Sequence, residues 1–388
     1  MVRELAIFLY LLLFKCTFFL FNLLPLKEKT TFVVSFGDNC LYILEEMRRQ
    51  NIQTQVAVLC KRDKMDPFMD YKNIHLVPFE SVHPLHWLQS IYHLATSRYI
   101  MVDNYYGFLA AVHFKKGVQC IQLWHASGAV KKFGLEEESI KDRGPRAIQR
   151  FLRVYRQFHK VVVGSDVMAA IFTKSFNLKK GQILTTGIPR TDFFFNETAI
   201  QKERQTLAQR HPCIKDKKVI LYAPTYRDHE LDHFSLHLEI EKMAAELRDD
   251  FVLLLRLHPA IKNRVKVANQ DRDFIVDVSS QQYGIHSLLV AADYLITDYS
   301  SIVVEYSLLL KPIIFFRYDV EEYTRTRGIL EQQLPGPVVS DTDAIIDLMH
   351  TDRFDIGPIR TYAEIWNKYS KGQSSEHLVQ YLFLENSP

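Results

Sequence analysis

Short apolar runs alternate with helical or polar segments along almost the whole chain, and this alternation constrains the fold more than any other feature. The pattern begins at Thr31–Ser35 and recurs at Tyr99–Val102, Val118–Leu123, Lys218–Ala223 and Phe251–Leu257. Each run has the length and composition of a buried strand, and a stretch typical of a helix or a polar turn follows it. Strands that alternate with helices predict doubly wound parallel sheets, whose ligands bind beyond the carboxyl ends of the strands.

The length of 388 residues is sufficient for two α/β domains of ordinary size. A polar helix from Glu197 to about Gln209 indicates the connection between them. We therefore predict two doubly wound parallel-sheet domains that face each other across a cleft. The expected boundaries are an apolar helix in 1–27, domains at 28–210 and 211–345, and C-terminal helices at 346–388 that pack back across both domains.

The N-terminal segment Leu5–Leu26 is almost wholly apolar, apart from Lys15 and Asn22, and is long enough to span a bilayer. No small-x-small cleavage motif follows it, which argues against a signal peptide. Positive charges flank it on both sides, so they do not fix an orientation. Lys15 would be costly at the bilayer centre but can reach water from a helix in the interface. We expect a membrane-associating helix that lies in the interface, with a true span as the alternative.

Composition and missing motifs exclude several classes of protein. A formal net charge of +3 provides no strong field for nucleic acid. The chain lacks G-x-G-x-x-G, G-x-x-x-x-G-K-[ST] and G-x-S-x-G, which argues against dinucleotide enzymes, P-loop ATPases and serine hydrolases. Dispersed cysteines without a C-x-x-C pair indicate a reducing compartment and no zinc site. These cysteines are Cys16, Cys40, Cys60, Cys120 and Cys213.

Clusters of polar residues follow the predicted strands in both halves of the chain. They are WHASG at 124–128, GIPRTD at 187–192, YAPTYRD at 222–228, RLHP at 256–259 and TDYSS at 297–301. Because α/β folds place ligands at strand ends, clusters from both halves predict one site shared by the two domains.

Two histidines and three arginines are candidate functional residues in these clusters. His125 and His258 suit proton transfer, since an unperturbed imidazole titrates near neutrality and would lose activity on the acid side; structural hydrogen bonding is the alternative. The arginine fork suits phosphate, with surface ion pairing as the alternative, which for Arg227 would involve its neighbour Asp228. The arginines are Arg190, Arg227 and Arg256.

The stretch from Ile296 to Asp319 predicts a strand end, a polar turn, a helix and a second strand. Ser300 and Ser301 are placed to cap the helix, whose N-terminus would attract an anion. Glu305 lies on the same face as Ser301 and would bind a neutral hydroxyl partner. The alternative is an ordinary helix cap with no ligand.

A basic amphipathic helix is predicted between residues 141 and 160. It suits an anionic membrane surface or a lipid diphosphate, with a solvated helix face as the alternative. Its basic positions include Arg146, Arg150 and Arg153, and its apolar positions are Ile148, Phe151, Leu152 and Val154.

Five motifs together resemble those of the CDP-glycerol glycerophosphotransferases of wall teichoic acid synthesis. They are WHASGAVKKFG, GIPRTD, YAPTYRD, RLHPAI and TDYSSIVVEYSLLLKPIIFFRYD, within about Thr31 to Tyr381. The resemblance implies a GT-B fold and the transfer of glycerol phosphate from CDP-glycerol to a hydroxyl, with release of CMP. The compact length and the form WHASG-x-x-KKFGLE resemble the priming enzymes, whereas the longer polymerases usually carry WHGTP. For a priming enzyme the acceptor would be the terminal N-acetylmannosamine of an undecaprenyl-diphosphate-linked disaccharide, at the cytoplasmic face of the cell membrane.

The resemblance also implies roles for individual residues. His125 and His258 would form the catalytic pair, with the acceptor on the N-terminal domain and CDP-glycerol on the C-terminal domain. Ala126-Ser127 replaces the Gly-Thr usual in the family, and Glu305 stands where Asp is common. No cofactor and no metal ligand is expected, and a need for Mg²⁺ stays open. The implied donor site comprises Trp124, His125, Ala126, Ser127, Gly128, Arg190, Pro224, Thr225, Arg256, Leu257, His258, Ser300, Ser301 and Glu305.

Three alternatives remain open from the sequence. The chain could be a glycerophosphate or ribitol-phosphate polymerase of the same family. It could be a GT-B glycosyltransferase that uses a nucleotide sugar, although Ser300-Ser301 with WHASG and YAPTYR favours a phosphotransferase. A membrane-bound scaffold without nucleotide binding is the non-enzymatic alternative.

Overall fold

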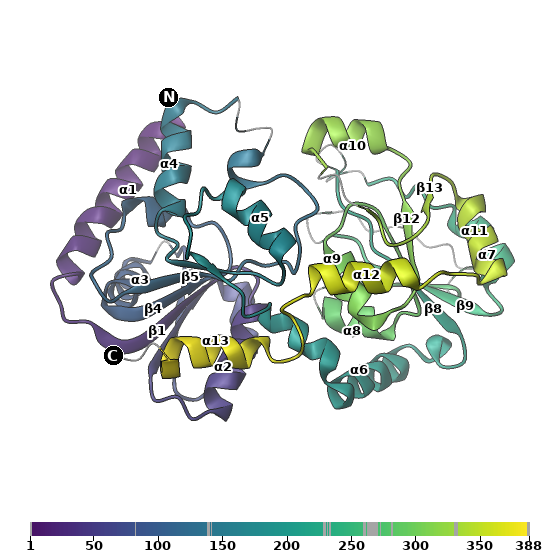
Figure 1. The fold of residues 1–388 in the computed structure, drawn as a ribbon, viewed down its shortest axis with the longest axis horizontal. Helices are drawn as coiled ribbons and strands as arrows, with labels where there is room; N and C mark the ends of the chain where they lie inside the picture. The colour runs from purple at the N-terminus through teal and green to yellow at the C-terminus, as the bar shows by residue number, and fades with distance from the viewer. Residues whose placement is uncertain are drawn as a thin grey trace. The chain divides into compact units, whose positions relative to one another are not determined.

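The computed structural model divides the chain into two compact units. Unit 1 comprises Met1–Ser127, Phe133–Asp192 and Lys368–Pro388, and unit 2 comprises Gly128–Lys132 and Phe193–Asn367. Figure 1 shows the ribbon with its elements labelled. The structure describes residues 2–81, 83–137, 140, 142–227, 230, 232, 234–258, 261, 271, 273–280, 282–329 and 333–385.

Unit 1 is built on a parallel sheet in the order β3-β2-β1-β4-β5-β6-β7. Strand β1 is buried over most of its length, as expected for a parallel sheet covered on both faces. The strands are β1 (Lys27–Val34), β2 (Gln55–Cys60), β3 (Ile74–Pro78), β4 (Ser97–Val102), β5 (Gln119–Gln122), β6 (Lys160–Val162) and β7 (Ile183–Leu184). The helices of unit 1 are α1 (Val2–Phe21), α2 (Asp38–Arg49), α3 (Pro84–Thr96), α4 (Pro145–Tyr155), α5 (Asp166–Ser175) and α13 (Ser374–Gln380).

Unit 2 contains a second parallel sheet in the order β10-β9-β8-β11-β12-β13. Its strands are β8 (Lys218–Tyr222), β9 (Phe251–Leu255), β10 (Ile275–Asp277), β11 (Tyr294–Thr297), β12 (Ile313–Phe316) and β13 (Val338–Val339). Its helices are α6 (Glu197–Arg210), α7 (Ile240–Leu247), α8 (Ile285–Ala291), α9 (Ile302–Tyr306), α10 (Val320–Arg327), α11 (Thr342–Thr351) and α12 (Gly357–Trp366). The predicted fold class, two doubly wound parallel-sheet domains preceded by an apolar helix, is confirmed.

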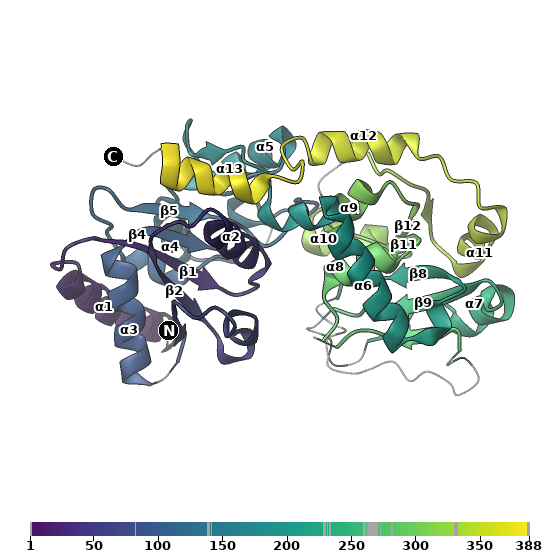
Figure 2. The same ribbon diagram turned by 90° about the horizontal axis from the view of Figure 1, so that it is seen from below.

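The boundary between the two units differs from the boundary expected at residue 210. Helix α6 packs on α8, where Ser287 Oγ donates to Glu203 Oε2 at 2.7 Å and Arg204 Nε donates to the Val290 carbonyl at 2.8 Å. These contacts place α6 in unit 2. The C-terminal segment divides, since α12 belongs to unit 2 whereas α13 lies beside α2 in unit 1 (Figure 2).

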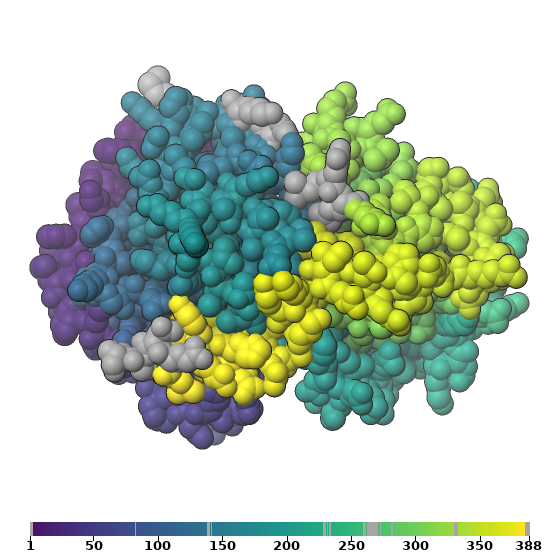
Figure 3. All heavy atoms as spheres, in the orientation of Figure 1, coloured from purple at the N-terminus to yellow at the C-terminus, as the bar shows by residue number. Residues whose placement is uncertain are grey.

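Helix α1 packs one side against unit 1 and exposes apolar side chains on the other. Phe14 is buried, stacks on Phe108 at 5.2 Å between ring centroids and meets Trp87 edge-on at 6.2 Å. Figure 1 shows α1 as a purple ribbon at one edge of unit 1, and purple atoms lie at the same place in Figure 3. Arg3–Phe21 is long and apolar enough to cross a membrane by length and composition. The exposed apolar side chains include Leu5, Phe8, Leu9, Leu12, Leu13, Phe19 and Leu20.

Candidate active site

In unit 1 the candidate site lies at the carboxyl end of β5, where the backbone turns sharply. Trp124 has φ +58°, a left-handed conformation that is rare for a bulky residue and therefore strained. Its N–H donates to Gln122 Oε1 at 2.8 Å, and its ring packs 4.9 Å from Phe133 between centroids. These contacts hold the strained turn and present the next residue, His125.

His125 is held in the form of a neutral base. Its ring stacks on Phe36 at 4.2 Å and on Trp124 at 4.4 Å. Its Nδ1 lies 3.2 Å from the Asp103 carbonyl, which can only accept, so Nδ1 carries the proton and Nε2 keeps its lone pair. Burial lowers the pKa of His125 to about 4, with the carbonyl opposing and Arg190 adding to the shift. The near-neutral pKa expected from the sequence is therefore wrong for this residue.

Asp103 organises the unit 1 site and was not among the sequence candidates. Its buried carboxylate accepts the N–H groups of Ser35 at 2.9 Å, Phe36 at 2.8 Å and Gly37 at 3.0 Å. The Tyr106 hydroxyl also donates to it, at 2.8 Å. Burial raises the pKa of Asp103, and these donors oppose the shift. One residue thus fixes the loop after β1 through its carboxylate and His125 through its carbonyl.

Arg190 lies beside His125 within unit 1. Its Nη1 donates to the His125 carbonyl at 3.0 Å and to Asp38 Oδ2 at 3.1 Å. Its own N–H donates to Asn39 Oδ1 at 3.0 Å. The structure therefore brings together Arg190 and His125, with the guanidinium supporting the loop that carries the histidine.

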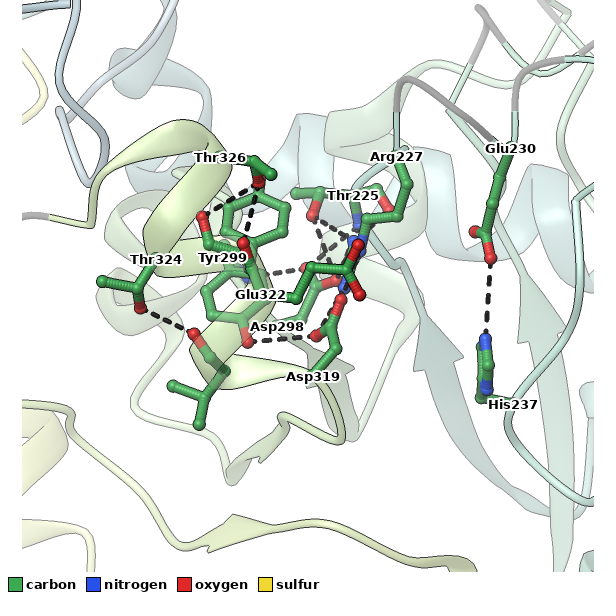
Figure 4. Close-up of polar contacts among 12 residues, drawn as sticks. Thr225, Arg227, Glu230, His237, Asp298, Tyr299, Asp319, Glu322, Thr324 and Thr326 are labelled. Atoms are coloured by element: carbon green, nitrogen blue, oxygen red, sulfur yellow. Dashed lines mark hydrogen bonds and ion pairs between the residues drawn. The ribbon is translucent and has the colours of Figure 1, made fainter. Parts of the chain in front are cut away.

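In unit 2 the corresponding organising residue is Asp298, which is buried (Figure 4). It accepts the Thr225 N–H at 3.0 Å, the Thr225 hydroxyl at 3.0 Å and Arg227 Nη1 at 2.9 Å. Arg227 is itself buried, and its Nε forms an ion pair with Asp319 at 2.7 Å. The expected pairing of Arg227 at the surface is therefore wrong, because Asp298 and Asp319 pair with its buried guanidinium, and a phosphate bound by Arg227 would have to share that group with two carboxylates. Asp228 lies outside the described residues.

Both units contain a buried aspartate at a strand end that holds a neighbouring loop, and the sequence does not reveal this arrangement. Asp103 follows β4, which lies next to β1 in its sheet. Asp298 follows β11, which lies next to β8 in the other sheet. The Asp103 carboxylate accepts N–H groups from the loop after β1, and the Asp298 carboxylate accepts the Thr225 N–H from the loop after β8. The same arrangement therefore shapes the strand-end loops of both units.

His258, the second predicted catalytic histidine, follows β9 in unit 2. Its ring lies 4.5 Å from that of Tyr226. Partial burial, and then the charges of Lys131 and Arg256, lower the pKa of His258 to about 4. Burial also lowers the pKa of Lys131 to about 8, although Asp298 opposes the shift. At neutral pH this part of unit 2 thus combines a neutral imidazole with a lysine cation.

Arg256 and Leu257 support the same loop. Arg256 Nη1 donates to the Val278 and Ser280 carbonyls, both at 2.8 Å, and the Leu257 N–H donates to Ser279 Oγ at 2.9 Å. The Leu257 side chain is buried in the core. Pro224 precedes Thr225 in the loop that Asp298 holds. Arg256 is thus engaged with backbone, and any ligand it binds must share its guanidinium.

A cavity of about 360 Å³ opens beside Asp298 in unit 2. Tyr299, Ser300 and Arg317 line it together with apolar residues such as Val303. Arg317 Nε donates to the Asp298 carbonyl at 3.1 Å, and its guanidinium lies 4.7 Å from the Tyr299 ring centroid. Arg317 was missed from the sequence, although it directly follows the apolar run of β12 and the strand-end rule could have found it.

Of the two serines expected to cap α9, only Ser300 contacts a backbone N–H of the helix. Ser301 makes no side-chain capping bond, and the Ile302 N–H instead lies 3.4 Å from Ser300 Oγ. Helix α9 has only 5 residues. Glu305 is buried, with His286 Nε2 at 3.7 Å from its Oε1. Among the residues that the structure describes, no group of three or more His, Cys, Asp or Glu could hold a metal ion.

Gly128 is required at its position by a close approach of side chains in unit 2. A Cβ added there would lie 2.5 Å from Val304 Cγ2.

We expect Gly128→Ala to lower the free energy of unfolding by about 1–3 kcal/mol through overpacking. Adding Val304→Ala should recover most of that loss in denaturant unfolding, because it removes the opposing methyl group. Gly144→Ala is the control, since nothing lies within 4 Å of its added Cβ. Strictly additive effects of the two substitutions would contradict the steric explanation.

Comparison with known proteins adds evidence from sequence. A family model described as CDP-Glycerol:Poly(glycerophosphate) glycerophosphotransferase matches residues 16–384. The teichoic acid glycerol-phosphate primase of Bacillus subtilis (strain 168) is 35% identical and covers 99% of both chains. The enzyme of the same name from Bacillus spizizenii is 33% identical over 97% of both chains. The teichoic acid poly(ribitol-phosphate) polymerase of that species is 31% identical, but the match covers only 58% of its length.

Solved structures resemble the chain in fold. The wall teichoic acid polymerase TagF, as its H444N variant, superposes with a TM-score of 0.80 at 21% identity, covering 98% of this chain and 97% of that one. A UDP-GlcNAc 2-epimerase from Neisseria meningitidis has a TM-score of 0.59 at 14% identity. The expected GT-B-like architecture is thereby confirmed.

Proposed function

The chain belongs to the CDP-glycerol:poly(glycerophosphate) glycerophosphotransferase family, and from this premise we propose that it catalyses the priming step of wall teichoic acid synthesis. It transfers glycerol phosphate from CDP-glycerol to the terminal N-acetylmannosamine of an undecaprenyl-diphosphate-linked disaccharide and releases CMP. The observation that carries the proposal is the full-length match to glycerol-phosphate primases, covering 99% of both chains in one case, whereas a ribitol-phosphate polymerase match covers 58% of the relative.

His125 serves as the general base in the proposed reaction. Its Nε2 accepts the proton of the acceptor hydroxyl while the hydroxyl oxygen bonds to the β-phosphorus. The bond from this phosphorus to the bridging oxygen breaks, and CMP leaves with the electron pair. The supporting observations are the Nδ1 contact to the Asp103 carbonyl and the low pKa of about 4, which keep the imidazole neutral.

Unit 2 binds the donor in this proposal. Lys131, Arg256 and Arg317 supply positive charge near the strand ends, which stabilises the negative charge that develops on CMP. His258, neutral at physiological pH because of its pKa of about 4, can donate a hydrogen bond to a phosphate oxygen. No metal ion or cofactor other than the nucleotide substrate is invoked.

Ser300→Ala should weaken CDP-glycerol binding about ten-fold, because a hydrogen bond to a charged group contributes about 1.5–3 kcal/mol. Ser300 lines the cavity beside Asp298, so its hydroxyl can reach a diphosphate oxygen there. Ser301→Ala is the matched control and should cost less, since Ser301 does not line that cavity. Calorimetry with CDP-glycerol measures both. Equal Kd values for Ser300→Ala and the unmodified chain would move the diphosphate site elsewhere.

We place the protein at the cytoplasmic face of the cell membrane as a peripheral or monotopic protein. Helix α1 exposes an apolar face, while Phe14 and Phe18 on its other face are buried against unit 1. A helix that packs along a folded unit fits the interface better than a bilayer span. Arg150 of α4 forms an ion pair with Glu4 of α1 at 2.7 Å, so the basic helix and the apolar helix are joined.

The test is a transfer assay with the purified chain of residues 1–388, CDP-glycerol and a short-chain lipid-linked disaccharide. We expect CMP release and addition of one glycerol phosphate, measured by mass spectrometry. Faster extension of an acceptor that already carries glycerol phosphate would indicate a polymerase. Sugar transfer from a nucleotide sugar would indicate a glycosyltransferase, and absence of any nucleotide binding would indicate a scaffold.

A further inference from the structure

Unit 1 contains a large cavity that the proposed chemistry does not use. Its volume is about 980 Å³, and it lies among α1, α3, α4 and the turn Gly107–Ala111. This volume is at the upper end of the range for small-molecule sites, which is about 300–1,000 Å³. Its walls are mainly apolar and aromatic, and include Ile7, Leu11, Phe14, Phe79, Trp87 and Phe108.

Three arginines join this apolar lining. Arg3 and Arg143 are exposed residues that line the cavity. Arg143 lies over the Phe151 ring, 5.1 Å from its centroid, and Arg150 is tied to Glu4 at 2.7 Å. An apolar chamber with exposed cations at its boundary is complementary to a molecule with a hydrocarbon chain and an anionic head.

One wall of the cavity continues into the support of His125. Tyr106 lines the cavity, and its hydroxyl donates to Asp103 Oδ1 at 2.8 Å. The carbonyl of the same Asp103 holds His125 Nδ1 at 3.2 Å. A ligand in this cavity would therefore lie next to the residues that position the base.

The cavity also reaches the exposed surface of α1. Tyr10 and Leu13 line it, yet they remain 45% and 58% exposed. Their side chains therefore face both the cavity and the outside of the helix. A long hydrocarbon chain can pass between the chamber and a bilayer at this point.

We propose that this cavity binds the first isoprenoid units of a polyprenyl diphosphate lipid, with Arg3 and Arg143 contacting its diphosphate. This inference rests on the proposed function, because the acceptor there is such a lipid. Burial of each CH₂ group contributes about 0.8 kcal/mol, so even a few isoprenoid units provide substantial affinity. A diphosphate also matches more than one arginine, which favours it over a phospholipid with a single phosphate.

The first experiment measures binding without catalysis. The probe is geranylgeranyl diphosphate, compared by calorimetry with geranylgeraniol and with inorganic diphosphate, using the chain of residues 1–388. Gly107→Trp fills the cavity wall, where nothing lies within 4 Å of an added Cβ. We expect this variant to weaken binding of the prenyl diphosphate at least about ten-fold, since several buried CH₂ groups are displaced. The control is Gly144→Trp, which also projects into open space and does not line the cavity.

If Gly107→Trp has a markedly lowered melting temperature, Gly107→Leu replaces it. This variant should also weaken binding of geranylgeranyl diphosphate, by a smaller factor. Binding unchanged in a folded Gly107 variant would overturn the assignment. So would tighter binding of phosphatidylglycerol in vesicles than of the prenyl diphosphate.

The second experiment tests the head group. In the Arg3→Gln/Arg143→Gln double variant, the preference for geranylgeranyl diphosphate over geranylgeraniol should fall about ten-fold, the worth of a hydrogen bond to a charged group. An unchanged preference would overturn the role of the arginines. Failure of these binding tests leaves CDP-glycerol-dependent CMP release intact, whereas failure of the proposed function abolishes that release and leaves prenyl diphosphate binding measurable.

Discussion

His125→Ala should lower kcat by about 10²–10⁴-fold, the usual contribution of a general base, while the Kd for CDP-glycerol stays close to that of the unmodified chain. The reason is that Nδ1 donates to the Asp103 carbonyl and leaves the Nε2 lone pair for the acceptor proton. Single-turnover kinetics at saturating donor measures the effect. His113→Ala is the matched control, because His113 is an exposed histidine of the same unit and accepts the Asn22 side-chain amide through its backbone carbonyl, which the substitution keeps.

The pH profile gives an independent check on the same residue. Because the pKa of His125 is lowered to about 4, the base is protonated only as the pH falls through that value. We therefore expect the acid limb of kcat/KM near pH 4 rather than near the ordinary value of 6.5. The folded state also loses stability as the pH falls from 6.5 toward about 4, because the unfolded chain binds the proton first.

His258→Ala distinguishes the two histidines. It should weaken CDP-glycerol binding and lower turnover together, because His258 lies near Lys131 and Arg256, which are proposed to bind the donor phosphates. Near-normal kcat in His125→Ala, combined with loss of turnover but retained donor binding in His258→Ala, would reverse the two roles.

Asp298→Ala should lower the stability of unit 2 by about 3–5 kcal/mol, because it leaves a buried guanidinium without one of its partners. Asp298 and Arg227 are 2% and 6% exposed, and Asp298 also accepts the Thr225 N–H. Hydrogen exchange followed by mass spectrometry should show faster exchange in the loops that contain Thr225 and Tyr299. Exchange in unit 1 should change little, which serves as the internal control.

A second substitution separates loss of charge balance from loss of packing. Arg227→Met in the Asp298→Ala background removes the unpaired cation, and we expect it to restore part of the lost stability. Asp319→Asn alone should cost less, since Asp319 is partly exposed and Asp298 still pairs with Arg227. A double variant less stable than Asp298→Ala would show that packing of the guanidinium, rather than its charge, dominates.

Local pattern was sufficient to predict most of the strands and the positions of the polar clusters, although the two-residue strand β13 was missed. The apolar runs that end at Leu123 and Ala223 are buried strand regions, and polar loops follow them. Such features are predictable because burial of apolar residues and the strand-end rule both act within a few residues of sequence.

Contacts between distant residues could not be predicted in the same way. Asp103 holds a loop 66–68 residues away, and Arg227 pairs with Asp298 at a separation of 71 residues. The neighbouring Asp228 was the plausible partner from sequence alone. Glu305 was expected beside a ligand because helical spacing gives a face, but spacing does not say whether that face is buried. The low histidine pKa values depend on burial, which only the folded chain shows.

The packing of α1 has a practical consequence for anyone who purifies this protein. Deletion of the first helix is the usual route to a water-soluble preparation. Here it would remove Phe14 and so expose the Trp87 and Phe108 rings that Phe14 contacts. The truncated chain would then expose a new apolar patch on unit 1 and would tend to aggregate. Exchanging only outward-facing leucines such as Leu9 and Leu12 for serine would spare those contacts, and a detergent-free sample would retain its first helix.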